Sequence, residues 1–497
     1  MIKLQSMNKL NFITFQLISF LFLANFCFAT TNKPVRENKP NIVFILADDL
    51  GWADLPCYGN TFNEAPNLDK LAKSGMRFTN AYAACPVCSP TRASIQSGQY
   101  PARVGVTDFI TGHWRPFEEV IVPKNRTQYL PSEIETLAES LKKAGYKTGY
   151  FGKWHLGYSP ETVPEGQGYD KAHVYSGGGF YNSRFMPQPE KKYEGRLSKI
   201  ITDMSIEFIE ENREQPFFLF LAHFDVHVQL DGDKDLIAKY LKKDRKDEYP
   251  GNAVYAAMVE HVDNSVGRVV EKLEELNLAE NTIVIFYSDN GGLIGRFDKV
   301  PLLDKRSLPV YENSPLKYIA SSNAPLRAEK GTVYEGGIRE PLIVKWPSKI
   351  KPAQTSEAII TSVDFYPTFL ELAGVEKPNQ VLDGKSILPE LLENSFDPER
   401  AIYWHYPVYH HDQPMGAIRK GDWKLVENFV TGKVSLYNLR ADISEAMDLS
   451  ELYPEKTDEL TQLLKAWQND VGAKFPVPNP DFDKSKRYEW GIHPDRK

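Results

Sequence analysis

The chain has 497 residues, 42% of them hydrophobic, and a formal net charge of −7 at pH 7. This length suggests two or three domains and provides enough apolar residues for a large buried core. Because an acidic chain is not a general nucleic-acid-binding protein, we expect no nucleic-acid partner. Any anionic substrate must then be bound by local Lys and Arg side chains.

The first 29 residues have the pattern of a secretory signal peptide. Lys3 and Lys9 form a positive start, residues 12–26 are mostly apolar, and Cys27 and Ala29 are small residues before a cleavage site. The apolar run is shorter than the about 20 residues of a membrane span, and no second long apolar run follows it. We therefore expect export to the periplasm or the medium, without a membrane span.

Runs of apolar, β-branched and aromatic residues predict buried strands of a parallel sheet. They lie at residues 41–46, 146–151, 216–222, 282–287 and 341–346. Helical patterns lie between them: one helix is opened by a capping box at Ser132 and Glu135 and ends at Lys143, and others span 255–276 and 363–373. Strands that alternate with helices predict an α/β layered fold with a mainly parallel sheet.

The pattern changes from about Arg400. Short segments separated by Gly-Asp or Gly-Lys predict a small antiparallel sheet at 402–405, 416–419, 423–426 and 435–437, and a helix at 460–467. We place a domain boundary near residue 395. The predicted organisation is a signal peptide at 1–29, an α/β domain at 30–395 and a C-terminal α+β subdomain at 396–497.

Oxygen-bearing side chains follow two of the predicted strands. Asp48 and Asp49 come after the first strand, and Asp289 and Asn290 come after the strand at 282–287. Each pair alone is more often a helix start or a turn, but ligands of open α/β sheets bind beyond the carboxyl ends of the strands. Two such pairs at matching strand ends favour a site for a hard cation such as Ca²⁺ or Mg²⁺, which takes oxygen ligands.

Cationic and imidazole side chains follow other predicted strands or turns. Lys153 and His155 follow the strand at 146–151, His227 follows the strand at 216–222, and Lys330 precedes a Gly-rich turn that enters the strand at 341–346. Taken singly, each is more simply read as a solvated loop residue. A rigid turn suits a positioned cation, so Lys330 is a candidate for binding an anion.

Cys88 begins the run Cys88-Ser89-Pro90-Thr91-Arg92 and is the second cysteine of a C-x-x-C pair with Cys85. Such a pair can be a redox dithiol, half a zinc site or a disulfide. The chain is much longer than a thioredoxin-like protein, and Cys27 and Cys57 do not supply the second pair that a zinc site needs. Cys57 and Cys85 can also pair with each other, which would leave Cys88 for chemistry.

With these segments in hand, the chain resembles the type I, formylglycine-dependent sulfatases over nearly all of its length after the signal peptide. The matching segments occur in the family's order at 41–49, 88–98, 152–157, 216–227, 282–292, 325–341 and 421–425. The resemblance implies an alkaline-phosphatase-like α/β domain with a smaller C-terminal subdomain. It also implies the activity of a sulfuric ester hydrolase.

The resemblance further implies a modified nucleophile and a metal ion. Cys88 would be oxidised by a formylglycine-generating enzyme to formylglycine (3-oxoalanine), whose hydrate attacks sulfur. Residue 88 would also contact a divalent ion, Ca²⁺ or alternatively Mg²⁺. The oxygen ligands of that ion would be Asp48, Asp49, Asp289 and Asn290.

The remaining roles fall on cations and histidines. By resemblance, Lys153 and Lys330 would bind sulfate oxygens and Arg92 would hold the hydrate and offset charge. His155 would act as the base when sulfate is released, and His227 would assist the leaving alcohol. The family often has His-Thr-Pro where this chain has His227 followed by Val and Gln.

The substrate expected from the family type is a sulfated carbohydrate, such as the marine polysaccharides ulvan or carrageenan or oligosaccharides cut from them. Candidate specificity residues, all expected on loops, are His113, Trp114, Arg115, Arg184, His410 and His411. Three alternatives stay open: a phosphodiesterase or phosphonate hydrolase of the same superfamily, a thiol redox protein that uses Cys85 and Cys88, and a non-catalytic glycan-binding relative.

Overall fold

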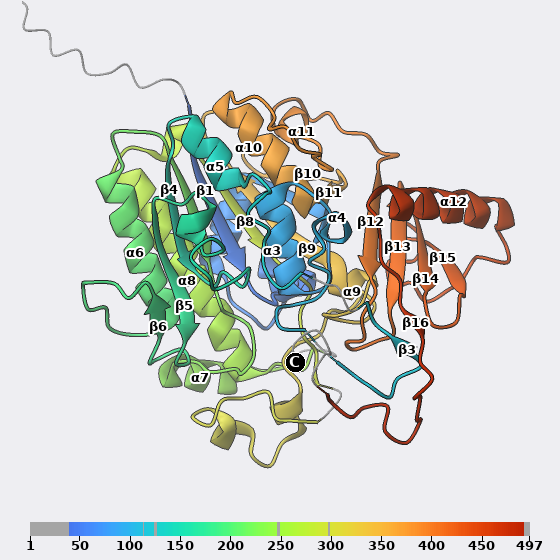
Figure 1. Ribbon diagram of the computed structural model, residues 1–497. Coiled ribbons are helices and arrows are strands. Elements are labelled where there is room, and N and C mark those ends of the chain that lie inside the picture. The colour runs from blue at the N-terminus through green and yellow to red at the C-terminus, as the bar shows by residue number, and fades with distance from the viewer. Residues whose placement is uncertain (1–38, 113, 124–126, 246–248, 297–298, 492–497) are drawn as a thin grey trace, which may run out of the picture. The chain divides into compact units, whose positions relative to one another are not determined.

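The computed structural model describes residues 39–112, 114–123, 127–245, 249–296 and 299–491 (Figure 1). The predicted signal peptide and His113 lie outside these described residues. Within the described ranges, no helix has the length and apolar character needed to cross a bilayer.

A ten-stranded sheet runs through the α/β part of the chain in the order β10-β2-β9-β8-β1-β7-β4-β5-β6, with β11 paired to β2. Its strands are β1 (Asn41–Ala47), β2 (Met76–Tyr82), β4 (Lys147–Gly152), β5 (Lys171–Gly177), β6 (Arg184–Met186), β7 (Phe217–Ala222), β8 (Thr282–Ser288), β9 (Arg339–Lys345), β10 (Gln354–Ser356) and β11 (Ile360–Thr361). The mainly parallel α/β sheet predicted from the sequence is confirmed.

The four neighbouring strands β8, β1, β7 and β4 are parallel and end level with one another. Ala47 at the end of β1 pairs with Ser288, Leu46 pairs with Ala222, and Ala222 also pairs with Gly152. The segments that begin at residues 48, 289, 223 and 153 therefore leave the sheet side by side. This register places the predicted site residues at one end of the sheet.

The direction of β9 differs from the prediction. The run at 341–346 was expected to be another parallel strand, but β9 runs antiparallel to both β8 and β2. A strand buried on both faces is apolar throughout whichever way it runs, so its composition does not encode its direction.

Helices cover both faces of this sheet (Figure 1). Successive side chains of β1 alternate between two cores: Val43 and Ile45 pack in one, and Ile42 and Phe44 pack in the other. Helices α2 (Pro66–Lys73), α6 (Leu197–Glu211), α7 (Lys234–Leu241) and α8 (Ala253–Glu275) contribute to the first core. Helices α3 (Cys88–Ser97), α4 (Pro101–Val104), α5 (Leu137–Lys143), α10 (Phe365–Ala373) and α11 (Leu388–Glu393) contribute to the second.

The predicted start of helix α5 was wrong by one turn. The capping box consists of Thr136 and Glu139, where each side chain accepts a hydrogen bond from the other's backbone N–H, and not of Ser132 and Glu135. Both quartets fit the S/T-x-x-E pattern. Glu135 instead accepts hydrogen bonds from the side chains of Ser140 and Lys143 and does not cap the N-terminus of the helix.

The C-terminal part contains the predicted antiparallel sheet, in the order β12-β13-β14-β15 (Figure 1). Its elements are β12 (Ala401–Tyr406), β13 (Met415–Lys420), β14 (Trp423–Asn428), β15 (Val434–Asn438) and helix α12 (Pro454–Asp470). Leu460 and Leu464 of α12 pack on one face of this sheet. Its other face, with Trp404, packs against Tyr82 and Val87 of the α/β part. The boundary near residue 395 stays a prediction.

A buried ion pair network joins the small sheet to the α/β part. Lys424 of β14 is 0% exposed, and its Nζ lies 2.9 Å from carboxylate oxygens of both Glu335 and Glu445. Glu335 begins the short helix α9 (Glu335–Ile338) in the Gly-rich turn and also pairs with Arg339 at 3.1 Å. Burial alone would raise the pKa of Glu335, but Lys424 and the nearby Arg residues outweigh it and lower that pKa to about 2.

We predict that Lys424→Met destabilises the fold strongly. The substitution removes the buried cation that Glu335 and Glu445 share and leaves Glu335 with Arg339, and breaking such a buried pair costs on the order of 3–5 kcal/mol. Urea unfolding of the purified variant measures this loss. Lys433→Met is the matched control. The side chain of Lys433 is 68% exposed and pairs with Asp448, so its loss should cost no more than about 1 kcal/mol. Equal losses in the two variants would contradict the structural role of Lys424.

Candidate active site

Cys88 is the first residue of helix α3, whose ten residues are all buried. The side chain of Cys88 is 2% exposed and lies on the floor of a cavity of about 640 Å³. Its Sγ and carboxylate oxygens of Asp48 and Asp289 all lie within 4.8 Å of one another. The partial positive charge of a helix N-terminus favours an anionic group at this position.

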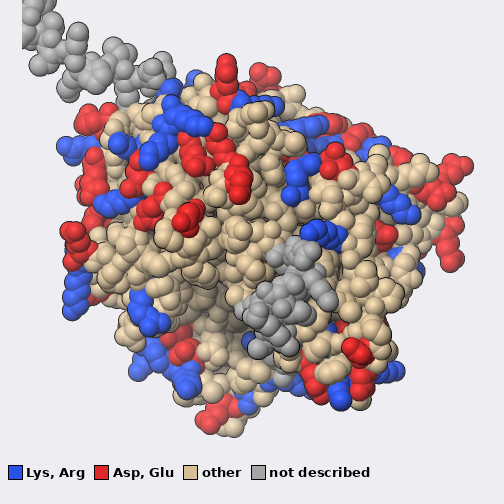
Figure 2. Space-filling view, viewed as in Figure 1, with Lys and Arg blue, Asp and Glu red and all other residues tan. Residues whose placement is uncertain are grey.

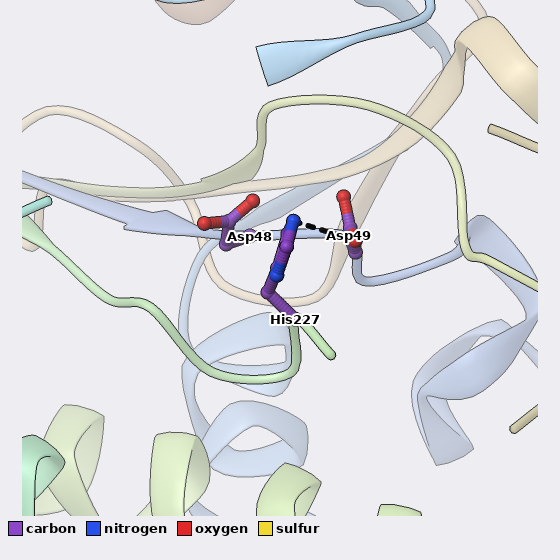
Figure 3. A group of neighbouring side chains, drawn as sticks. All are labelled: Asp48, Asp49 and His227. Atoms are coloured by element: carbon purple, nitrogen blue, oxygen red, sulfur yellow. Dashed lines mark ion pairs between the residues drawn. The ribbon is translucent and has the colours of Figure 1, made fainter. Parts of the chain in front are cut away.

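Asp48, Asp49, Asp289 and Asn290 meet where β1 and β8 end. The Asn290 side chain donates to Asp49 Oδ1 at 2.8 Å, and the Asp49 backbone N–H donates to Asp289 Oδ1 at 3.3 Å. All four side chains are buried. Figure 3 shows Asp48 and Asp49 on either side of His227, whose Nε2 lies 3.7 Å from Asp49 Oδ2.

Three cations lie beside the three carboxylates. Arg92 contacts Asp289 at 2.8 Å and Asp48 at 3.6 Å, Lys153 pairs with Asp48, and Lys330 lies 2.7 Å from Asp49. Three negative and three positive side chains are thus balanced in the buried site. Figure 2 shows Lys and Arg interspersed with Asp and Glu over the visible face of the molecule.

Proximity of these charges shifts the pKa of each carboxyl group. Burial would raise the pKa of Asp48, but the neighbouring cations, Lys153 foremost, hold it below its usual value. Asp49 follows the same pattern, with Lys330 as the main opposing charge. Burial and the nearby Asp48 carboxylate instead raise the pKa of Asp289 well above its usual value, although Arg92 lies 2.8 Å away. Added positive charge would therefore stabilise this cluster.

His155 faces residue 88 directly. Its Nδ1 lies 3.3 Å from Cys88 Sγ, and its Nε2 lies against the backbone carbonyl of Ile110. Burial, together with the charge of Lys153, lowers the pKa of His155 to about 3, so the ring is neutral at pH 7. A neutral ring that donates Nε2–H to Ile110 presents the lone pair of Nδ1 to residue 88. That arrangement suits a base.

His227 has the opposite orientation. Its Nδ1 lies 2.5 Å from the carbonyl oxygen of Val228, which leaves Nε2 as the nitrogen nearest Asp49. Burial, followed by the charge of Lys330, lowers the pKa of His227 to about 4. The side chain is partly exposed and lines the cavity. His223, the residue directly after β7, is fully buried and absent from the described lining of the cavity.

Two site residues have left-handed backbone conformations. Asp49 has φ of +62° and His155 has φ of +64°. Side chains other than glycine rarely adopt this region, and strain of this kind is found mainly at functional sites. Both residues lie within three positions of the end of their strands, and His155 lines the cavity.

The sulfatase family model matches residues 40–375, and the model for the C-terminal region of N-sulphoglucosamine sulphohydrolase matches residues 328–471. The chain belongs to the sulfatase family. It is a sulfuric ester hydrolase of the α/β type that the sequence predicted.

Individual relatives agree with this assignment. A sulfatase of Formosa agariphila is 31% identical over 93% of this chain and 96% of the relative. The N-acetylgalactosamine-6-sulfatase of Rattus norvegicus is 30% identical over 88% of this chain and 81% of the relative. The crystal structure of Ps i-CgsB in complex with k-i-k-neocarrahexaose matches with a TM-score of 0.72 and 28% identity, covering 90% of this chain and 96% of that one.

Membership of the sulfatase family implies a metal ion and a formylglycine, and the residues present fit both. Asp48 Oδ1 and Asn290 Oδ1 are buried oxygens without a hydrogen-bond donor in the described part of the chain. A cluster of oxygen donors suits a hard cation. Cys88 lies at a helix N-terminus beside that cluster, where the modified side chain would face both the ion and the cavity.

The structure also bears on whether the cysteines form a disulfide or a redox pair. Cys57, Cys85 and Cys88, the cysteines among the described residues, are free thiols. Cys85 is buried, and burial raises the pKa of its thiol well above the usual value. A thiol of this kind is a poor nucleophile, which disfavours thiol redox chemistry between Cys85 and Cys88.

The cavity brings together only some of the proposed specificity residues. His410 and His411 line it, whereas Trp114, Arg115 and Arg184 are not part of its described lining. Arg184 was expected on a loop but belongs to strand β6.

Several residues that line the cavity were not identified from the sequence. They include Tyr158, Tyr175, Phe224, Arg296 and Trp490. Trp490 is more than 400 positions from Cys88, and no local pattern connects the two.

We predict that Ca²⁺ stabilises the chelator-treated sulfatase against heat. A ligand that binds only the folded state at about 100 times its Kd adds roughly 2.7 kcal/mol of stability. Thermal unfolding with and without Ca²⁺ measures the shift in Tm.

Asp289→Asn should remove most of this shift, because it deletes one charged ligand and keeps the side-chain shape. Asp203→Asn on α6, which changes a partly buried carboxylate that pairs with Lys199 and Arg268 and does not line the described cavity, should keep the shift. An undiminished shift in the Asp289 variant would place the ion elsewhere.

Proposed function

We propose that this sulfatase hydrolyses sulfate esters of a carbohydrate by means of a formylglycine at position 88 and a divalent cation, Ca²⁺ or alternatively Mg²⁺. The observation that carries the proposal is the position of Cys88. It lies at a helix N-terminus, within 4.8 Å of the carboxylates of Asp48 and Asp289 and 3.3 Å from His155 Nδ1.

The two groups that the family implies have separate tasks. A cation held by Asp48, Asp49, Asp289 and Asn290 would supply positive charge that polarises the sulfate and favours an oxygen nucleophile. Formylglycine at position 88, as its hydrate, would supply that nucleophile and a second hydroxyl through which sulfate is released. A formylglycine-generating enzyme is therefore a required partner.

The chain's own cations would bind and orient the transferred group. Lys153 and Lys330 line the cavity beside Cys88, so their ammonium groups are placed to hold sulfate oxygens. The Lys330 segment is fixed by its neighbour, because the Gly331 N–H donates to the carbonyl of Pro86, two residues before Cys88. Such preorganised cations stabilise negative charge as it develops during transfer.

The two histidines would move protons at opposite sides of the reacting group. His155 presents Nδ1 to residue 88 and would take the proton that is lost when sulfate is released. His227 would assist the leaving alcohol through Nε2. A bound sulfate ester adds negative charge beside the His227 ring and favours the protonated form that this role requires.

Relatives support a carbohydrate as the substrate. The names of two similar proteins refer to N-acetylgalactosamine-6-sulfate chemistry and to a neocarrahexaose complex. Aromatic side chains, including Tyr158, Tyr175 and Phe224, line the cavity and suit the apolar faces of sugar rings. We propose a sulfated polysaccharide such as carrageenan or ulvan, or its oligosaccharides, reached after export through the signal peptide.

The function is tested with paired small substrates. Protein made together with a formylglycine-generating enzyme should hydrolyse 4-nitrophenyl sulfate with a far higher kcat/KM than 4-nitrophenyl phosphate. Mass spectrometry of the peptide with residue 88 should show a mass roughly 18 Da below that of the free thiol. A preference for the phosphate ester would instead support the phosphodiesterase alternative.

Cys88→Ala should fold normally and lose about 10⁴-fold or more in kcat, because the nucleophile is removed. Cys57→Ala, at a thiol outside the described cavity lining, should keep full activity. Turnover by the Cys88 variant close to that of the parent protein would disprove the mechanism.

His155→Ala should lower kcat by about 10²–10⁴-fold, the usual contribution of a general acid or base, with a smaller change in KM. His173→Ala is the control, since His173 on β5 contacts the carbonyl of Pro187 and does not line the cavity as described. Steady-state kinetics with 4-nitrophenyl sulfate measures both variants. A change in KM alone would make His155 a substrate-binding residue rather than the base.

A further inference from the structure

Residues 477–491, here called the C-terminal arm, run back along the α/β part of the chain. Strand β16 (Val477–Pro478) pairs antiparallel with β3 (Val120–Ile121). Three further backbone N–H groups of the arm donate to carbonyls of the same segment: Asn479 to Glu119 at 3.0 Å, Asp483 to Phe117 at 3.2 Å and Gly491 to Trp114 at 3.0 Å. The arm is thus held at both ends.

The arm ends at the cavity. Trp490 lines the same cavity as Cys88, although its side chain is 43% exposed. The guanidinium of Arg115 lies 5.1 Å from the centre of the Trp490 ring. Arg115 is itself buried and donates to the carbonyl of His410 at 2.7 Å. The Trp490 ring is therefore fixed to the cavity wall rather than extended into solvent.

The cavity wall beside Trp490, formed by His410 and His411, contacts the Lys330 segment on the floor of the site. His411, the neighbour of His410, places Nδ1 2.9 Å from the carbonyl oxygen of Lys330. The ring of His410 packs against Gly331, where an added Cβ would lie 2.2 Å from His410 Nδ1. A chain of contacts consequently leads from Trp490 through Arg115 and the histidine pair to the proposed sulfate-binding lysine.

The cavity is larger than one sulfate group requires. A volume of about 640 Å³ falls within the range of pockets that hold ligands of drug size. Cys88, at 2% exposed, marks the floor, and Trp490, at 43% exposed, marks the mouth. A large, rigid, half-exposed aromatic ring at the mouth offers a flat apolar surface, which matches the C–H face of a sugar.

We propose that Trp490 stacks against a sugar unit next to the one whose sulfate is on the floor of the cavity. The inference rests on the proposed function and deepens it, because it makes oligosaccharides and polysaccharides better substrates than isolated sulfated monosaccharides or small aryl sulfates. Arg296, which lines the same cavity, adds positive charge suited to a carbohydrate that carries several sulfates.

The test compares one large and one small substrate, a carrageenan hexasaccharide and 4-nitrophenyl sulfate. Trp490→Ala should lower the ratio of the two kcat/KM values about tenfold, mainly through the KM for the hexasaccharide. Trp490→Phe keeps a flat ring and should restore most of that ratio. Phe482→Ala, at a 44% exposed aromatic of the same arm outside the described lining, should leave the ratio unchanged.

Binding can be measured separately from turnover. Calorimetric titration of the Cys88→Ala protein with the hexasaccharide should give a Kd that Trp490→Ala raises about tenfold. If the parent protein hydrolyses the aryl sulfate but the Cys88→Ala protein does not bind the hexasaccharide, the stacking proposal fails and the proposed function stands. If binding depends on Trp490 but neither ester is hydrolysed, the proposed function fails and the stacking site stands. Equal losses on both substrates in Trp490→Ala also overturn the proposal.

Discussion

The carboxylates of Asp48, Asp49 and Asp289 are buried beside the cations Arg92, Lys153 and Lys330, and each of these charges alone would cost several kcal/mol to bury. Their mutual balance makes the burial possible. It depends on the level ends of four parallel strands, because three of the six residues follow β1 or β8 directly and Lys153 follows β4. With a divalent cation bound, the same balance would become a net positive site that fits an anionic ester.

The C-terminal part participates in this site rather than standing apart from it. One short segment has Lys330 at its start and Glu335 at its end, and the two residues form ion pairs with different parts of the protein. Lys330 pairs with Asp49 on the floor of the cavity, and Glu335 pairs with Lys424 of the small sheet. A rearrangement of the small sheet would therefore be transmitted to the proposed sulfate-binding lysine through the backbone of residues 331–334.

Features set by strand position could be predicted from the sequence, and features set by backbone geometry or long-range packing could not. Asp48 and Asp289 were identified because a buried strand reveals its own end, and neighbouring parallel strands end together. The antiparallel direction of β9 was missed because a strand buried on both faces is apolar in either direction. The left-handed conformations of Asp49 and His155 leave no mark on composition, since neither residue is glycine.

Trp490 shows a further limit of prediction from the sequence. In this chain, the residues proposed for the reaction and the residues proposed to select the substrate come from different parts of the fold. The floor of the cavity comes from strand ends and from α3, whose positions follow from the fold itself. The mouth comes from loops and from an arm held by hydrogen bonds to residues 114–121, which a different sequence can redirect without disturbing the sheet. Substrate choice would then evolve mainly at the mouth. That is why the sequence predicts sulfate ester hydrolysis from its motifs, whereas the glycan, under the stacking proposal, would be selected by residues such as Trp490 that belong to none of them.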